Sequence, residues 1–95
     1  QIHTKTAGGY AILSNIPNII GVSMLVSGEA KFAGKRIIET GFPEWMRIAF
    51  IQRLNTNGIW ESLRPSSDKT LLEGDRLIIF CSPDRVVELE KRFKV

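Results

Sequence analysis

The feature that most constrains the fold is a stretch in which a tight turn leads directly into an apolar strand. From Leu71 to Phe80 it reads LLEGDRLIIF. Gly74 permits the turn, and Asp75 can accept hydrogen bonds from the N–H groups of that turn. The run that follows, as far as Cys81, is apolar and rich in isoleucine, which suits a central strand. The chain is therefore expected to build a sheet around a strand that begins near residue 75.

Other segments also have the pattern of strands. Residues 19–27 are almost continuously apolar, so they suit a second central strand, with the even-numbered residues from Val22 to Val26 facing one side. Residues 46–53 have the pattern of a half-buried strand. Asn57-Gly58 then predicts a hairpin, because this dipeptide tolerates the positive φ angles of tight turns, and residues 59–64 form the returning strand.

Two short helical segments are predicted between these strands. Residues 32–41 are expected to form a short helix with Ile37 and Ile38 pointing inward and Gly41 as its stop. Residues 68–73 are expected to form a single turn of α-helix or 3-10 helix that ends at Gly74. Both segments are short, so each supplies a connection rather than a layer of the fold.

The C-terminal helix has the clearest signals. Ser82-Pro83-Asp84 supplies an oxygen side chain at the cap, a proline at the first position and an acid in the first turn. Val86, Leu89 and Phe93 then lie on one stripe of the helix. The order of elements is β-α-β-β-β-α, with a turn before the last strand. This order predicts an α+β fold in which a mostly antiparallel sheet carries its helices on one face.

The 95 residues are enough for one domain and no second core. Residues 1–18 contain Gly8-Gly9 and the run Asn15-Ile16-Pro17-Asn18, which interrupt regular structure. We interpret them as a linker or N-terminal arm with room for one short strand, and residues 19–95 as the folded domain. Because the chain begins with Gln1, we expect it to be part of a longer protein.

Composition argues against several classes of protein. The chain is 43% apolar and 24% charged, which is typical of a globular protein and excludes disorder. Its net charge of +3 is spread along the chain, whereas a nucleic-acid interface concentrates its basic residues. No apolar run approaches the roughly 18 residues that span a bilayer. With one cysteine, the chain has no internal disulfide to indicate secretion.

Residues suited to catalysis or metal binding are scarce. His3 and Cys81 are the only histidine and cysteine, too few for a zinc or iron–sulfur site. His3 lies in the arm with no third group to orient it, and Cys81 ends an apolar strand, where a buried and unreactive thiol is usual. Gly34-Lys35 lacks the preceding glycine of a phosphate-binding loop. We therefore predict no enzyme, no metal and no cofactor.

Basic side chains are the remaining candidates for a binding site. Arg47, Arg53 and Arg64 lie on or beside the predicted hairpin, and Lys35 lies at a predicted helix start. Two interpretations stay open. These residues could form a rim that binds a small anion, because guanidinium groups match phosphate geometry. Alternatively, they lie in water at strand ends and protect an exposed sheet edge.

Several short motifs occur in a recognisable order. They are Ala33-Gly34-Lys35, Ile51-Gln52-Arg53, Arg64-Pro65, Leu72-Glu73-Gly74-Asp75-Arg76-Leu77 and Ser82-Pro83. In this order and spacing they resemble the RCK C-terminal (TrkA-C) family, a regulatory module of potassium channels and cation transporters. The resemblance covers about residues 20–93.

The resemblance implies a cytosolic homodimer, attached to a parent membrane channel or transporter, that controls a potassium or other cation pathway. It also implies a small anionic or nucleotide ligand and no nucleic acid, since some members bind cyclic di-AMP or other ligands at the dimer interface. The cyclic di-AMP pattern has Asp, Arg and Asn after an apolar pair; counted from Ile37-Ile38, this chain has Gly41, Pro43 and Ala49. The alternative is a swapped-hairpin DNA-binding transcriptional regulator, because a Gly-Asp turn into an apolar strand also occurs there.

Overall fold

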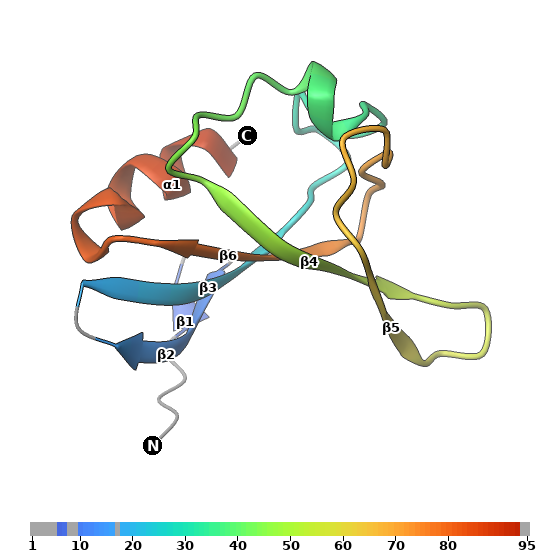
Figure 1. The fold of residues 1–95 in the computed structure, drawn as a ribbon. Coiled ribbons are helices and arrows are strands. Elements are labelled where there is room, and N and C mark those ends of the chain that lie inside the picture. Colours follow the sequence, from blue (N-terminus) through green and yellow to red (C-terminus); the bar gives the residue numbers. More distant parts are fainter. Residues whose placement is uncertain (1–5, 8–9, 17, 94–95) are drawn as a thin grey trace.

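Among the described residues, one antiparallel sheet of six strands forms the body of the protein (Figure 1). The computed structural model describes residues 6–7, 10–16 and 18–93. Across the sheet, the strands lie in the order β1 (Thr6–Ala7), β2 (Tyr10–Ile16), β3 (Ile19–Leu25), β6 (Arg76–Cys81), β4 (Arg47–Leu54) and β5 (Trp60–Leu63). The two apolar runs that were predicted to be central, β3 and β6, are neighbours in the middle of the sheet.

The pairing of β3 with β6 forms the centre of the core. Val22 lies opposite Ile79, and Met24 lies opposite Leu77. These four side chains are at most 2% exposed. Since burying each such side chain contributes about 1.5–3 kcal/mol, this strand pair accounts for much of the stability of the sheet.

In the part of the chain that the structure describes, a single α-helix covers the core face of the sheet. α1 (Val86–Phe93) follows directly on a 3-10 turn, η2 (Pro83–Arg85). Leu89 and Phe93 are buried in the core, and Val86 packs against it. The predicted apolar stripe is therefore confirmed. Within the described residues, no helix combines the length and the apolar character needed to cross a bilayer.

The predicted fold class is confirmed. From residue 19 onward the elements run β3, η1 (Ile37–Glu39), β4, β5, β6 and α1, which matches the β-α-β-β-β-α order. Figure 1 shows α1 and the short coil of η1 on the same side of the sheet. The first helical element is a single 3-10 turn and not a full helix.

The helix predicted over residues 32–41 is therefore wrong in its extent. The chain turns at Gly34, whose φ is +85°. Its backbone groups then find partners far away in the sequence: the Gly34 N–H donates to the Leu71 carbonyl at 2.7 Å, and the Leu71 N–H donates to the Lys35 carbonyl at 2.9 Å. Because these groups are satisfied across the chain, no helix is needed to satisfy them.

The same pairing accounts for two further errors. The helical turn predicted over residues 68–73 is absent from the structure, and Thr70 instead forms a bridge with Arg36. Ile38, predicted to point inward, is 66% exposed, whereas Ile37 packs against the core. The bridge fixes which side chains of residues 36–38 face the core. Its partner, Thr70, lies more than thirty positions away, so the local sequence pattern does not reveal it.

The sheet continues into the segment that was interpreted as an arm. β1 and β2 both lie within residues 1–18, and β2 pairs antiparallel with β3 from Tyr10 opposite Met24 to Ile16 opposite Ile19. Asn18 makes the turn between these two strands with a φ of +69°. His3, Gly8-Gly9 and Pro17 lie outside the described residues.

The predicted hairpin joins β4 to β5. Gly58 has a φ of +77°, as the turn requires. The Asn55 side-chain oxygen accepts the Asn57 N–H at 2.8 Å and the Ile59 N–H at 3.0 Å, which closes the loop. In Figure 1 this hairpin extends away from α1 and from the rest of the sheet.

Candidate functional site

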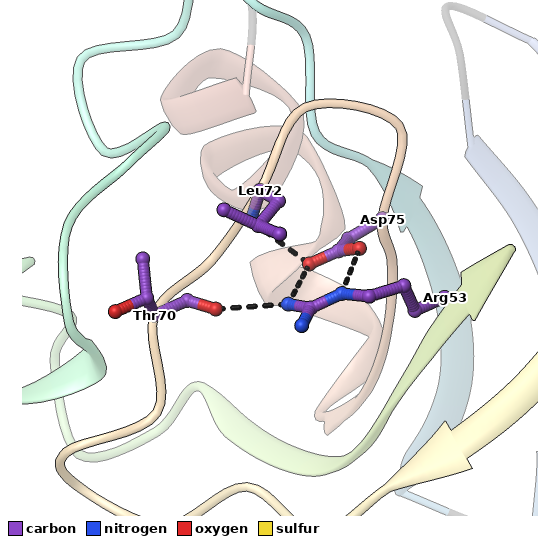
Figure 2. A network of polar contacts seen from close by, with 4 residues as sticks. All are labelled: Arg53, Thr70, Leu72 and Asp75. Atoms are coloured by element: carbon purple, nitrogen blue, oxygen red, sulfur yellow. Dashed lines mark hydrogen bonds and ion pairs between the residues drawn. The ribbon is translucent and has the colours of Figure 1, made fainter. Parts of the chain in front are cut away.

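Arg53 in β4 and Asp75, just before β6, form a two-point ion pair (Figure 2). Arg53 Nε donates to Asp75 Oδ1 at 2.9 Å, and Arg53 Nη2 donates to Asp75 Oδ2 at 2.7 Å. The same Nη2 donates to the Thr70 carbonyl at 2.9 Å. The Leu72 N–H donates to Asp75 Oδ2, also at 2.9 Å. We call this network the Arg53–Asp75 clasp.

The turn before β6 positions the aspartate of the clasp. The Asp75 N–H donates to the Leu72 carbonyl at 3.1 Å, and Gly74 between them has a φ of +89°. The turn is attached to the end of β3, because the Gly74 N–H donates to the Val26 carbonyl at 2.9 Å and the Val26 N–H donates to the Asp75 carbonyl at 2.8 Å. Gly74 thus makes the turn, and the Asp75 carboxylate accepts a hydrogen bond from the Leu72 N–H of the same turn.

The clasp lies in a largely water-excluded place. The Asp75 side chain is 2% exposed and the Arg53 side chain 26%. Hydrogen bonds to the Asp75 carboxylate raise the pKa of Arg53, while burial works in the opposite direction. Two of the three guanidinium nitrogens of Arg53 already donate to groups of the chain. The guanidinium group of Arg53 therefore holds the turn before β6 against β4.

A second cluster of charge surrounds a hollow beside the C-terminal end of α1. The hollow has a volume of about 590 Å³. It is lined by Glu29, Lys31, Phe32, Lys35, Thr40, Phe42, Lys91 and Arg92. The four basic residues are exposed, whereas Phe32 is buried and Phe42 half-buried. We call this site the basic hollow.

Packing of phenylalanines brings these basic side chains together. Lys31 precedes Phe32 in the sequence, and Arg92 precedes Phe93. The Phe32 and Phe93 rings pack edge to face with their centroids 4.8 Å apart, and Phe42 packs on Phe32 at 5.2 Å. Each phenylalanine ring is fixed in the core, so the basic residue that precedes it in the sequence lies at the surface next to the contact between the two rings. The hollow is thus a consequence of core packing.

The other predicted binding residues lie elsewhere. Arg64 lines a separate hollow of about 460 Å³. Its other lining residues are Ala49, Phe50, Ser62, Leu63 and Pro65. Arg47 is exposed at the start of β4, opposite Phe80 of β6. With Lys35 in the basic hollow and Arg53 in the clasp, the structure distributes the four predicted residues over four places.

Of the four basic residues that line the basic hollow, sequence reasoning identified Lys35 and missed Lys31, Lys91 and Arg92. The available signal was a basic residue next to a core phenylalanine, which occurs once before β4 and again in the last turn of α1. The pairs Lys31-Phe32 and Arg92-Phe93 contribute to one site only if the two phenylalanine rings are in contact. That contact joins residues about sixty positions apart, and periodicity does not reveal it.

The one cysteine has the expected environment. Cys81 is 5% exposed, and burial, helped by the negative charge of Asp84, raises the pKa of its thiol. A protonated, buried thiol is a poor nucleophile. In the part of the chain that the structure describes, no three His, Cys, Asp or Glu side chains are grouped so as to hold a metal ion.

The antiparallel sheet and the helix that covers it define a small α+β domain. The family model of the TrkA-C domain matches residues 22–94. Because this match covers most of the chain, the chain belongs to the TrkA-C (RCK C-terminal) family, whose members are regulatory domains associated with cation transport. A search of curated proteins gave no match. Membership favours the regulatory interpretation over the DNA-binding alternative.

Proposed function

We propose that residues 19–95 act as a cytoplasmic regulatory domain that controls the passage of potassium or another cation through a parent channel or transporter. The observation that carries this proposal is the match to the TrkA-C family over residues 22–94. The domain works by binding and by changes of geometry.

The proposal includes a homodimer, which the outer face of the sheet supports. This face lies on the side away from α1, and the strand register places Leu25, Leu54, Trp60 and Phe80 on it. These side chains are 40–52% exposed. Leu54 and Trp60 lie opposite each other, and exposed large apolar side chains on one face favour an interaction surface. A second copy of the domain would remove them from water and add burial to a small core.

Regulation then follows from linkage between ligand binding and dimer geometry. A ligand that binds one arrangement of the two copies more tightly increases the population of that arrangement, and the attached membrane protein responds. Lys35 and Arg64 line separate hollows and Arg47 is exposed on β4, so we propose them as ligand contacts at more than one place on the domain. The proposed part of Arg53 is to position the turn through the clasp.

Sedimentation equilibrium of the 95-residue chain, from low to high micromolar concentration, tests the dimer. We expect a dimer for the unaltered chain and a folded monomer for Phe80→Glu, because the new charge would be buried against the partner copy. Val87→Glu is the matched control, since Val87 is 64% exposed on α1. It should remain a dimer. A folded monomer of the unaltered chain at high micromolar concentration would contradict the proposal.

Transport by the full-length parent protein tests the regulatory role. We expect Phe80→Glu in the parent to change potassium uptake, whereas Val87→Glu should leave it unchanged. Unaltered uptake in a Phe80→Glu parent whose domains no longer dimerise would show that the pairing of two domains does not control transport.

A further inference from the structure

We propose that the basic hollow is a binding site for a small soluble anion of the diphosphate or triphosphate class. This inference rests on the proposed function only in one respect, namely that the bound anion is the ligand to which the regulatory domain responds. Binding itself follows from the residues that line the hollow.

The first argument is charge. Four cationic side chains, those of Lys31, Lys35, Lys91 and Arg92, line the hollow together with one carboxylate, that of Glu29. The excess of three positive charges equals the net charge of +3 of the whole chain. The other nine basic and nine acidic residues of the chain sum to zero, so the net positive charge falls on the residues that line this hollow. Such concentration attracts anions and raises their local population.

The second argument is the absence of neutralising partners. Three ion pairs occur in the described part of the chain: Arg36–Glu39, Arg53–Asp75 and Arg85–Glu88. Not one of them involves a cation of the basic hollow, although the Glu29 carboxylate lies among these cations. The chain therefore pairs arginines with acids elsewhere and leaves this group of cations available to a ligand.

The third argument is how the site is assembled. Lys91 and Arg92 lie in the last turn of α1, where a positive charge also stabilises the helix end. That effect does not account for Lys31 and Lys35, which belong to the connection between β3 and β4. Two segments far apart in the sequence converge on one hollow whose walls include aromatic rings. A bound anion would link the connection to α1.

The size and the donors of the hollow indicate the class of anion. Its volume of about 590 Å³ lies in the range of roughly 300–1,000 Å³ that is usual for small-molecule sites. Several cations spread around such a space suit several negative charges better than one. The Arg92 guanidinium can form a two-point contact with a phosphate, and lysine ammonium groups supply point charges.

Titration of the 95-residue chain with inorganic pyrophosphate, followed by calorimetry and by NMR of the backbone amides, tests the inference. We expect binding that weakens as salt rises, because exposed charges are screened. Amide shifts should be largest in the connection between β3 and β4 and in the last turn of α1. Orthophosphate, which carries less charge, should bind more weakly than pyrophosphate.

Charge variants make the test specific to the hollow. Lys31→Gln and Lys91→Gln should each weaken pyrophosphate binding about twofold to fivefold, as expected for one exposed ion pair. Glu29→Gln should tighten binding by about twofold, because it removes the repelling carboxylate. A variant that merely damaged the fold would not produce this gain. Lys69→Gln, which removes a lysine outside the hollow, is the control and should bind as the unaltered chain does.

The inference fails if pyrophosphate does not bind at millimolar concentration, or if Lys31→Gln, Lys91→Gln and Lys69→Gln weaken binding equally. These outcomes differ from a failure of the proposed function. A chain that binds pyrophosphate as described but does not dimerise or affect transport would retain the site and lose the regulatory role. A dimer that affects transport without binding pyrophosphate would show the reverse.

Discussion

The Arg53–Asp75 clasp and the basic hollow both gather charged side chains, but in opposite ways. In the clasp, one cation meets one carboxylate that is 2% exposed, with two direct contacts of 2.7 and 2.9 Å. In the hollow, four exposed cations share one carboxylate. A buried charge must be neutralised where it lies, because water is absent. An exposed excess of charge is tolerated by the fold and is therefore available for binding.

The largest effect is expected from removing the cation of the clasp. Arg53→Met keeps much of the side-chain volume but leaves the buried Asp75 carboxylate without its partner. Removing one partner of a buried pair costs about 3–5 kcal/mol, and because Arg53 is partly exposed we expect a loss of about 3 kcal/mol in the free energy of unfolding. Urea unfolding measures it.

The matched substitution in the basic hollow is Lys35→Met. Since Lys35 is exposed and makes no ion pair within the described residues, its loss should change the free energy of unfolding by less than about 0.5 kcal/mol. If Arg53→Met and Lys35→Met lowered the free energy of unfolding equally, the distinction between charges that stabilise the fold and charges that are available for binding would be wrong.

A smaller effect is expected from the turn that holds the clasp. Gly74→Ala forces a residue with a side chain into a φ of +89°, which costs about 1–2 kcal/mol. Gly28→Ala is the control. Its new Cβ would come within 2.5 Å of Glu73 Oε1, but this is the tip of an exposed, flexible side chain that can move away. A loss in Gly28→Ala as large as that in Gly74→Ala would show that the left-handed backbone of the turn is unimportant.

The two regions also differ in how far the sequence predicts them. The turn at Gly74 was predictable, because a positive φ is a local requirement that one residue type meets. The strand β6 was also predictable, because its continuous apolar run is a local pattern that is typical of a central strand. The partner of Asp75 was not predictable. The local pattern around Arg53 is that of a strand residue exposed to water, and only the pairing of β4 with β6 brings this side chain to the turn.

Long-range backbone pairing limited the remaining predictions. Residues 32–41 carry a helical pattern, and the helix is replaced because backbone bonds such as that from Gly34 to Leu71 satisfy their polar groups. In the basic hollow, Lys35 was recognised from its position in a motif. Lys31 and Arg92 were not, because their proximity depends on the contact between Phe32 and Phe93.

The smallest effect concerns the thiol of Cys81. This group is buried like the Asp75 carboxylate but forms no ion pair, and it is shielded from water, unlike the cations of the basic hollow. Burial raises the pKa of its thiol above the ordinary value of 9.0. The folded state therefore holds this proton more tightly than the unfolded state. The resulting stability is fully present below about pH 9 and is lost as the pH rises through the folded-state pKa. Cys81→Ala lacks this contribution, so its free energy of unfolding should fall less steeply above pH 9.

Comparison of the two slopes isolates the contribution of the thiol, because Cys81→Ala removes this ionisable group and no other. Cys81→Ala also leaves a small cavity, but that loss is the same at every pH and cancels from the slope. Urea unfolding at a series of pH values from neutral to alkaline gives both curves. Parallel curves would mean that the thiol ionises as easily in the folded protein as in the unfolded chain. The core around β6 would then admit water. In that case the buried charges of the clasp would differ less from the exposed charges of the basic hollow than we infer.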